Sequence, residues 1–231
     1  MSIKKLFFPF IVMAGILSSC TGTAQKTTLS VDEFEKAIAA SNIQILDVRT
    51  MGEYQGGFIN NALQANWNDQ NEFQQRVKAL DKKKPVYAYC LSGKRSAAAV
   101  EWLNQNGFTA YNMVGGINAW RNAGKKLEQS VQAEQITLQQ YMAEVSSDKT
   151  VLVDFSAVWC PPCKVMAPVM DSLVATNGTQ FKFLKIDGGQ QTAIGKELKV
   201  EGFPTFIIYK DGKEVWRKEG IVDKKEILEK L

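Results

Sequence analysis

Residues 151–164 read Val-Leu-Val-Asp-Phe-Ser-Ala-Val-Trp-Cys-Pro-Pro-Cys-Lys and indicate the fold of the C-terminal half. An apolar strand pattern ends at two cysteines that are separated by two residues, where a helix is expected to begin. The two prolines between them suit a helix start, where a missing N–H costs little. An apolar stripe at helical spacing follows, formed by Met166, Val169, Met170, Leu173 and Val174. The stretch therefore predicts a strand, a turn with two thiols, and a helix.

Two thiols at this spacing can close a small disulfide ring and open it again. The helix N-terminus stabilises a thiolate on the first sulfur, which makes Cys160 the attacking nucleophile. The alternative interpretation is half of a zinc site. The chain has four cysteines and no histidine, and the other two cysteines lie far away in sequence. We therefore expect thiol–disulfide exchange at a redox disulfide Cys160–Cys163, and no metal site.

Further motifs in residues 136–231 follow in a fixed order. They are Asp154-Phe-x-Ala-x-Trp-Cys-Pro-Pro-Cys-Lys164, Ala167-Pro168, Gly202-Phe-Pro-Thr205, Lys210-Asp-Gly212 and Gly220. In this order they resemble the thioredoxin family over nearly the whole C-terminal half. The resemblance implies a thioredoxin fold in which Pro204 is a cis-proline facing the disulfide. It also implies that Trp159 and Pro204 bind the substrate chain, and that Asp154 accepts a proton as Cys163 resolves the mixed disulfide.

The aspartate of this motif stands out without the family as well. Asp154 lies inside an otherwise apolar strand, where a carboxylate is unfavourable to bury and its pKa should be raised. The alternative is a strand-end carboxylate that is bonded to backbone. Two departures from the family are visible. Pro-Pro replaces the Gly-Pro of most thioredoxins, and Phe183 stands where many have a lysine near the buried aspartate. Lys185, two residues on, is the candidate to replace that lysine.

A second thiol motif lies in the N-terminal half. Residues 86–89 predict a short buried strand that runs into Cys90-Leu-Ser-Gly-Lys-Arg95. A helix is then expected, with Ser96, Ala99, Val100 and Leu103 on one face and Gly107 beyond its end. A strand, a short loop with a glycine and a helix together point several backbone N–H groups at one anionic atom. The positive charges of Lys94 and Arg95 also favour a thiolate on Cys90.

This loop predicts a persulfide site. A Cys90 thiolate could attack a sulfane sulfur and hold it, and the loop formed by Leu91, Ser92, Gly93 and Lys94 would cradle the terminal sulfur. The alternative is a buried structural cysteine in a domain that has lost its activity.

The flanks of the loop carry a family resemblance. They are Leu46-Asp-Val-Arg49, Glu53-Tyr54, Gly57-Phe-Ile-Asn-Asn-Ala62 and Gly115-Gly-Ile-Asn-Ala-Trp120. With the thiol loop they resemble the rhodanese (sulfurtransferase) family over residues 27–126. The resemblance implies a parallel-sheet α/β domain, Cys90 and Arg95 as catalytic residues, and structural roles for Asp47 and Arg49. Phe58-Ile-Asn-Asn departs from the usual His-Ile-Pro-Gly. The short loop from Cys90 to Arg95 suits sulfur, whereas phosphatase and arsenate-reducing relatives use a longer one.

The first residues predict where in the cell the protein is located. Lys4 and Lys5 precede an apolar run over residues 6–17, which is too short to span a bilayer but suits a signal-peptide core. Leu17-Ser-Ser-Cys20 resembles the bacterial lipoprotein box, which implies that Cys20 carries a lipid. An ordinary signal peptide is the alternative. We expect a signal peptide over 1–19, a tether over 20–26, and a cell-envelope protein that is lipid-anchored to a bacterial membrane and faces the periplasm.

Length and composition set the remaining limits. The 231 residues suit two α/β domains of about 100 residues each, 27–126 and 136–231, joined by a linker over 127–135. Part of 124–135 could pair as a first strand of the second domain, whose expected order is βαβαββα, with a short final helix from near Asp223. Ser30-x-x-Glu33 and Thr137-x-x-Gln140 predict helix starts.

Composition excludes several functions. The net charge is +4, of which Lys4 and Lys5 supply two, and no basic cluster with aromatics appears, so nucleic acid is not an expected partner. The absence of histidine excludes a Ser-His-Asp or Cys-His hydrolase and a histidine-ligated haem. No cofactor is implied, because low-pKa thiolates carry both chemistries.

Together these features predict an envelope protein in which Cys90 carries a persulfide and the Cys160/Cys163 dithiol performs thiol–disulfide exchange. Reduction of the Cys90 persulfide is the expected link between the two. The expected partners are a small sulfane-sulfur donor, disulfide-bearing or persulfidated proteins, and a membrane electron donor. The alternative is a general periplasmic disulfide reductase whose first domain serves as a docking module.

Overall fold

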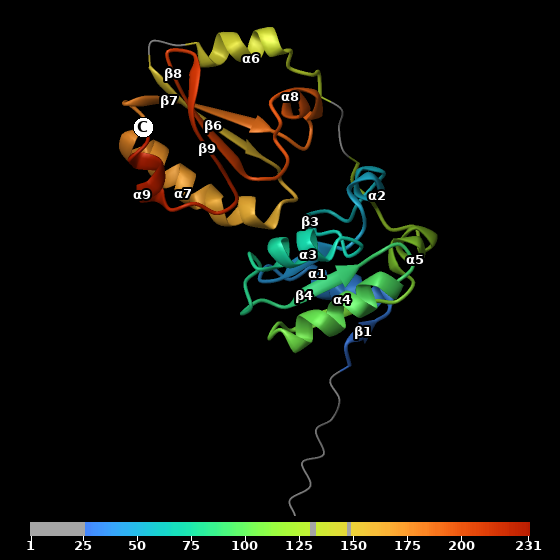
Figure 1. Cartoon of the computed structure of the whole chain (residues 1–231). Coiled ribbons are helices and arrows are strands. Elements are labelled where there is room, and N and C mark those ends of the chain that lie inside the picture. The colour runs from blue at the N-terminus through green and yellow to red at the C-terminus, as the bar shows by residue number, and fades with distance from the viewer. Residues whose placement is uncertain (1–25, 130–132, 147–148) are drawn as a thin grey trace, which may run out of the picture.

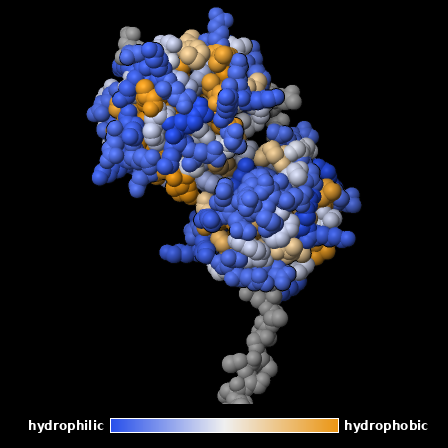
Figure 2. Space-filling model, in the orientation of Figure 1, coloured by the Kyte–Doolittle hydropathy of each residue, from blue (hydrophilic) through white to orange (hydrophobic). Residues whose placement is uncertain are grey.

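The computed structural model of the chain describes residues 26–129, 133–146 and 149–231. Two lobes are visible (Figures 1 and 2), and each is built on its own sheet (Figure 1). The expected signal peptide, Cys20 and all of the expected tether but its last residue lie outside the described residues. Within the described ranges, no helix has both the length and the apolar character needed to cross a membrane.

The N-terminal domain has a five-stranded sheet in the order β1-β5-β4-β2-β3, and all of its neighbouring strands are parallel. The strands are β1 (Thr28–Leu29), β2 (Gln44–Asp47), β3 (Ala62–Gln64), β4 (Val86–Tyr89) and β5 (Ala110–Met113). The helices are α1 (Val31–Ile38), α2 (Met51–Gln55), α3 (Gln70–Val77), α4 (Lys94–Gln105) and α5 (Gly116–Asn122). The predicted parallel-sheet domain and its buried strand at 86–89 are confirmed.

The two faces of this sheet have separate cores, as expected for a parallel sheet covered on both sides. Phe73 of α3 and Leu103 of α4 pack with Val86 in one core. Phe34 of α1 and Ile117 of α5 belong to the other. The expected inner face of α4 is confirmed, with buried residues Ser96, Ala99, Val100 and Leu103.

A buried ion pair locks the end of β2. Asp47 and Arg49 are almost fully buried, and Arg49 Nη2 lies 2.5 Å from Asp47 Oδ2. The same Nη2 donates to the carbonyl of Gly57 at 2.8 Å. These contacts tie β2 to the segment after α2, which is a structural role. Breaking such a buried pair by removing one partner is strongly destabilising, because the other charge is left uncompensated.

Reciprocal side-chain caps start several helices. The two predicted ones are present, Ser30 with Glu33 at α1 and Thr137 with Gln140 at α6. Sequence reasoning missed a third, in which Thr50 and Glu53 cap the short helix α2. This third cap matters for the site, because it fixes the carboxylate of Glu53 at the start of α2.

The C-terminal domain has a mixed four-stranded sheet in the order β7-β6-β8-β9, in which only β6 and β7 are parallel. The strands are β6 (Thr150–Ser156), β7 (Phe181–Asp187), β8 (Thr205–Lys210) and β9 (Lys213–Glu219). The helices are α6 (Leu138–Val145), α7 (Pro161–Asn177), α8 (Thr192–Glu197) and α9 (Lys224–Leu228). From β6 to α9 the order is βαβαββα as predicted, and the short final helix begins directly after Asp223.

The described part of the connecting segment does not form the first strand that could have been added to the second domain. In its described part, Glu128 forms an isolated antiparallel bridge with Phe58 of the N-terminal domain, so it does not supply a first strand to the second domain. The N–H of Phe58 donates to the carbonyl of Glu128 at 2.9 Å, and the N–H of Glu128 donates back at 2.8 Å. The described start of the connecting segment is therefore paired with the N-terminal domain.

Candidate functional site

The dithiol lies where α7 begins. Cys160 and Cys163 form a disulfide, with their Cα atoms 5.3 Å apart. Cys160 is the N-cap of α7, and the prolines at 161 and 162 fill the first two helical positions. Because prolines have no N–H, the first free helical amide is that of Cys163, and it points at the Cys160 sulfur at 3.2 Å. A thiolate released on Cys160 would be stabilised by this amide.

The proline segment expected beside the disulfide is there. The Phe203–Pro204 peptide bond is cis, and the carbonyl oxygen of Phe203 lies 3.4 Å from the Cys160 sulfur. The hydroxyl of Thr205 donates to the carbonyl of Gly202 at 2.7 Å and closes this turn. The motif at 202–205 thus meets the dithiol.

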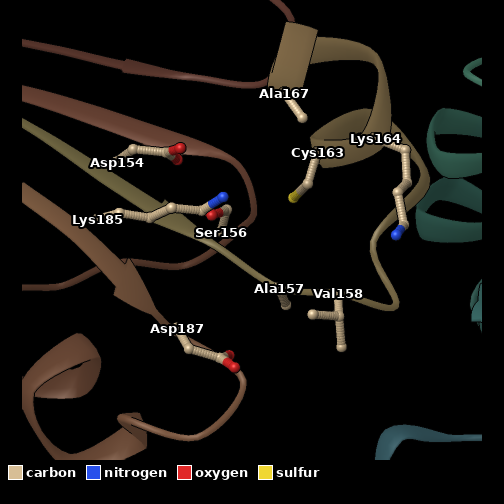
Figure 3. Close-up of a pocket in the computed structure, with 9 residues that line it drawn as sticks. All are labelled: Asp154, Ser156, Ala157, Val158, Cys163, Lys164, Ala167, Lys185 and Asp187. Atoms are coloured by element: carbon tan, nitrogen blue, oxygen red, sulfur yellow. The ribbon is translucent and has the colours of Figure 1, made fainter. Parts of the chain in front are cut away.

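Behind the disulfide is a cavity of about 330 Å³ that is lined by Asp154, Lys185 and Cys163. Figure 3 shows the Cys163 sulfur, the Asp154 carboxylate and the Lys185 side chain directed into this cavity. Asp154 is only 4% exposed, and its Oδ1 has no hydrogen-bond partner among the described residues. A carboxylate that has an oxygen without a partner and lines the same cavity as the second thiol is suited to accept a proton.

Burial raises the pKa of Asp154 to about 6, although the charge of Lys185 and a hydrogen bond from Ser156 act in the opposite direction. Lys185 is the register partner of Asp154 on the neighbouring strand β7. Its side chain lines the same cavity as the Asp154 carboxylate, so Lys185 is a cation beside the buried aspartate. Phe183 instead packs against the core on the α7 side of the sheet.

Asp154→Asn should therefore stabilise the C-terminal domain in a pH-dependent way. The folded carboxyl has a raised pKa, so the folded state binds more protons than the unfolded state between about pH 4 and pH 6, and stability falls as the pH rises through that window. Asparagine does not titrate. The free energy of unfolding of Asp154→Asn should therefore equal that of wild type below about pH 4 and exceed it by about 3 kcal/mol above pH 6.

Urea unfolding at both ends of this pH window measures the effect, with Asp171→Asn on the exposed side of α7 as the control. An equal gain for Asp154→Asn at both pH values would contradict the assignment.

The second thiol lies at the end of β4. Cys90 is only 1% exposed, and its sulfur accepts hydrogen bonds from the amide of Gly93 at 3.2 Å and from the hydroxyl of Ser96 at 3.4 Å. Burial alone would raise the pKa of the Cys90 thiol. Hydrogen bonds from the Ser96 hydroxyl and from the amides of Ser96, Ser92 and Gly93 outweigh it, so the pKa lies below its ordinary value. The backbone cup expected from the sequence is present.

The loop is held from the other side by the Gly-Gly turn at the start of α5. The amide of Ile117 donates to the carbonyl of Cys90 at 2.8 Å. Gly93 has φ +87°, and a Cβ there would lie 3.0 Å from the backbone of Met113 and Gly115. A Cβ on Gly116 would collide with the carbonyl oxygen of Cys90. Only glycine fits these two positions.

The two cations of the loop have different surroundings. Lys94 is exposed to solvent. Arg95 makes a two-pronged ion pair with Glu53 of α2, at 2.8 and 2.6 Å, and also interacts with Cys90. Sequence reasoning quoted Glu53 as a motif residue and placed Ser96 on an apolar face, but it gave neither a role in the site. A hydroxyl among buried alanine, valine and leucine was the signal for Ser96.

Ser96→Ala should raise the pKa of the Cys90 thiol, because it removes a hydrogen bond to the thiolate. At about pH 7 the rate of sulfur uptake from thiosulfate should fall about tenfold, and its pH profile should move to higher pH. Ser92→Ala is the matched control, since Ser92 contributes its backbone amide and not its hydroxyl. A profile that stays in place in Ser96→Ala would count against the assigned role.

The structure groups the predicted site residues into two centres. Arg95 and the 90–94 loop form one, and Trp159, Pro204 and Asp154 surround the other. Helix α2 lies between them, because its Glu53 pairs with Arg95 while its Tyr54 lies 6.3 Å from Trp159, centroid to centroid. Leu91 and Ser92 are exposed, whereas Trp159 is only 8% exposed. In the described ranges no group of three or more His, Cys, Asp or Glu side chains is placed to hold a metal ion.

Comparisons with known proteins match both domains. A rhodanese-like domain model matches residues 30–123, and a thioredoxin model matches residues 132–231. The chain is 35% identical over 85 residues to the thioredoxin-like protein slr0233 of Synechocystis, which covers 37% of this chain and 81% of that protein. It is 44% identical to thioredoxin H5 of Arabidopsis thaliana over 37% of this chain and 70% of that protein.

Other curated relatives are matched over only about half of their own length. Chloroplastic thioredoxin Y1 of Arabidopsis thaliana is 38% identical over 38% of this chain, and the chain spans only 51% of its length. Among solved structures, a rhodanese-like domain protein from Staphylococcus aureus is 33% identical, with a TM-score of 0.40, over 46% of this chain and 99% of that chain. A thioredoxin from Nicotiana alata is 32% identical, with a TM-score of 0.36, over 44% of this chain and 95% of that chain.

The fold and the Cys-x-x-Cys pair at a helix start define a thioredoxin-type domain that follows a rhodanese-like one. The chain belongs to the thioredoxin family.

Proposed function

We propose that this chain is a sulfur-transfer and thiol redox protein whose two thiol centres work in sequence. Cys90 accepts a sulfane sulfur and holds it as a persulfide, and the Cys160/Cys163 dithiol reduces that persulfide. The observation that carries the proposal is the Cys90 sulfur itself. The Gly93 amide and the Ser96 hydroxyl converge on it, in a chain that also holds a dithiol.

The first step loads Cys90. Its thiolate attacks the outer sulfur of a donor such as thiosulfate, and the new S–S bond forms as the donor's S–S bond breaks. Sulfite leaves with the electron pair of the broken bond. The amides that stabilise the thiolate before the reaction are positioned to stabilise the terminal sulfur afterwards.

The second step unloads Cys90. The Cys160 thiolate attacks the terminal sulfur, so Cys90 leaves as a thiolate and the persulfide passes to Cys160. The Cys163 thiolate then attacks the Cys160 sulfur and expels hydrosulfide, which closes the Cys160–Cys163 disulfide. The sulfane sulfur gains two electrons and the dithiol loses two. Asp154, which faces Cys163 across the cavity, takes the Cys163 proton.

A second turnover requires two electrons from outside the chain. In an oxidising envelope these come from a membrane electron donor that reduces the disulfide. The other proposed partners are a small sulfane-sulfur donor and disulfide-bearing or persulfidated proteins. The fused domains raise the effective concentration of one centre for the other.

Thiosulfate and peptide mass spectrometry test this function. The reduced chain is exposed to thiosulfate, and the mass of each cysteine peptide is recorded. One added sulfur atom on the Cys90 peptide should accumulate in a Cys160→Ser variant and be discharged in the parent chain. A Cys90 peptide that never gains sulfur would refute the sulfur-transfer half.

We also propose that the chain is lipid-anchored through Cys20 in the cell envelope and faces the periplasm. Support comes from the lipoprotein box and the short apolar run before it. Cys20→Ala is expected to move the protein from the membrane fraction to the soluble fraction, since the lipid would be its anchor. Fractionation followed by immunoblotting measures this. A Cys20→Ala protein that stays with the membrane would contradict the anchor.

A second candidate function is general reduction of protein disulfides, with the rhodanese-like domain as a docking module. The disulfide, the cis-proline segment and the Cys163 amide all lie within the C-terminal domain, and this favours it. In this case Cys90 would be dispensable.

A further inference from the structure

The loop that carries the dithiol is docked on the rhodanese-like domain. The N–H of Gln64, the last residue of β3, donates to the carbonyl of Trp159 at 2.9 Å. The guanidinium of Arg76 on α3 lies 5.0 Å from the centroid of the Trp159 ring, a cation–π distance. Tyr54 of α2 packs on the same ring. Three elements of one domain therefore hold one residue of the other.

The docked face continues to the disulfide. Cys160 has no exposed surface, and it shares a buried apolar cluster with Trp159 and Tyr54 that crosses the domain boundary. Phe203, which precedes the cis-proline, packs edge-on against Trp159 at 5.7 Å. The rhodanese-like domain thus lies against the residues that surround the reactive sulfur.

Several features of Arg76 indicate that it belongs to a built interface. Its guanidinium pairs with Glu72 at 3.1 Å and donates to both the carbonyl and the side-chain oxygen of Gln64. These bonds hold the Arg76 side chain of α3 against β3, the edge strand that also supplies the amide to Trp159. Arginine stacks on an aromatic ring through its flat guanidinium, which lysine lacks.

The contact between the Trp159 loop and the rhodanese-like domain has features that allow the two to separate. Grooves of about 660 and 510 Å³ flank it, and Arg76 and Phe203 line both. Gln64 lies on an edge strand, and its bond to Trp159 joins backbone to backbone. An extended segment of another protein could make the same bond to the Trp159 carbonyl, because backbone pairing needs no particular side chain.

We propose that the face formed by Tyr54, Gln64 and Arg76 is a docking surface for the chain's own dithiol loop, and that it competes with protein substrates for that loop. The docked chain is closed, and opening of the two domains precedes reaction with a protein disulfide. The inference rests on the dithiol half of the proposed function and not on sulfur transfer. A small disulfide needs far less of the covered surface than a protein does.

Arg76→Ala in the full chain tests the docking. With dithiothreitol as the electron source, reduction of insulin disulfides should become at least about fivefold faster, because a larger fraction of the chain is open. Reaction of the reduced chain with a small aromatic disulfide should change less. The rate of insulin reduction by Arg76→Lys should lie between those of wild type and Arg76→Ala, because lysine keeps the charge but lacks the flat stacking surface. Lys83→Ala removes an exposed cation of the same domain and should match wild type.

Hydrogen exchange gives a second readout that does not depend on activity. The Gln64 amide should be protected in the oxidised wild type and exchange faster in Arg76→Ala, whereas the β4 amides should keep their protection and so report an intact fold. An unprotected Gln64 amide together with equal insulin rates in all four proteins would overturn the docking. No insulin reduction by any of them, with Gln64 still protected, would support the docking and instead remove the dithiol function.

Discussion

A Cys163→Ser chain is expected to stop turning over protein disulfides and to accumulate as a mixed disulfide through Cys160. Cys160 caps α7 and has the Cys163 amide on its sulfur, and serine keeps this amide, so the first attack still occurs. The second attack requires the thiol that faces Asp154 in the cavity, and serine cannot supply it. Turnover of insulin should fall at least about a thousandfold, as when other catalytic nucleophiles are removed.

Non-reducing gels and intact mass measure the trapped species. Cys90→Ser is the control, because it removes a thiol and leaves the dithiol intact. A Cys163→Ser chain that still turns over, or that traps its partner on Cys90, would contradict the assigned order of attack.

A Cys90→Ser chain is expected to lose the release of sulfide from thiosulfate and to keep insulin reduction within about twofold of wild type. The Cys90 sulfur lies in the cup of amides and hydroxyl that the proposed persulfide requires, and the dithiol lies in the other domain. Sulfide release can be followed with dithiothreitol supplied in excess, and Ser92→Ala serves as the matched control.

This variant separates the two candidate functions. If sulfide release survives in Cys90→Ser, the dithiol attacks the donor directly and the rhodanese-like domain acts only as a docking module. If both activities fall together, the substitution has disturbed the fold. Thermal unfolding of the variant checks this, because Cys90 is buried.

Much of the local structure could be predicted from the sequence. Strand, loop and helix around Cys90, and strand, turn and helix around Cys160, follow from apolar spacing and from prolines and glycines at the right positions. Two caps were predicted from their Ser-x-x-Glu and Thr-x-x-Gln patterns. The raised pKa of Asp154 followed from a carboxylate inside an apolar strand. All of these depend on neighbours within a few residues.

What could not be predicted depends on pairs that are distant in the chain. Glu53 and Arg95 are 42 residues apart, and only the order of the parallel strands brings their elements together. Trp159 was expected to bind the substrate chain, and its cover by Tyr54 and Arg76 of the other domain was not foreseen. Tyr54, Arg76 and Trp159 each also make contacts within their own domain. Their positions in the sequence therefore do not mark the surface where the two domains meet.

The glycines around the Cys90 loop have a consequence for comparing this chain with its relatives. A methyl group at position 116 would occupy the place of the Cys90 carbonyl oxygen, and one at position 93 would crowd the turn before α5. A related chain could therefore retain both the cysteine and the arginine of the loop and still lose its cup through one alanine. When such chains are sorted into working sulfurtransferases and silent copies, positions 93 and 116 are a more sensitive marker than the thiol itself.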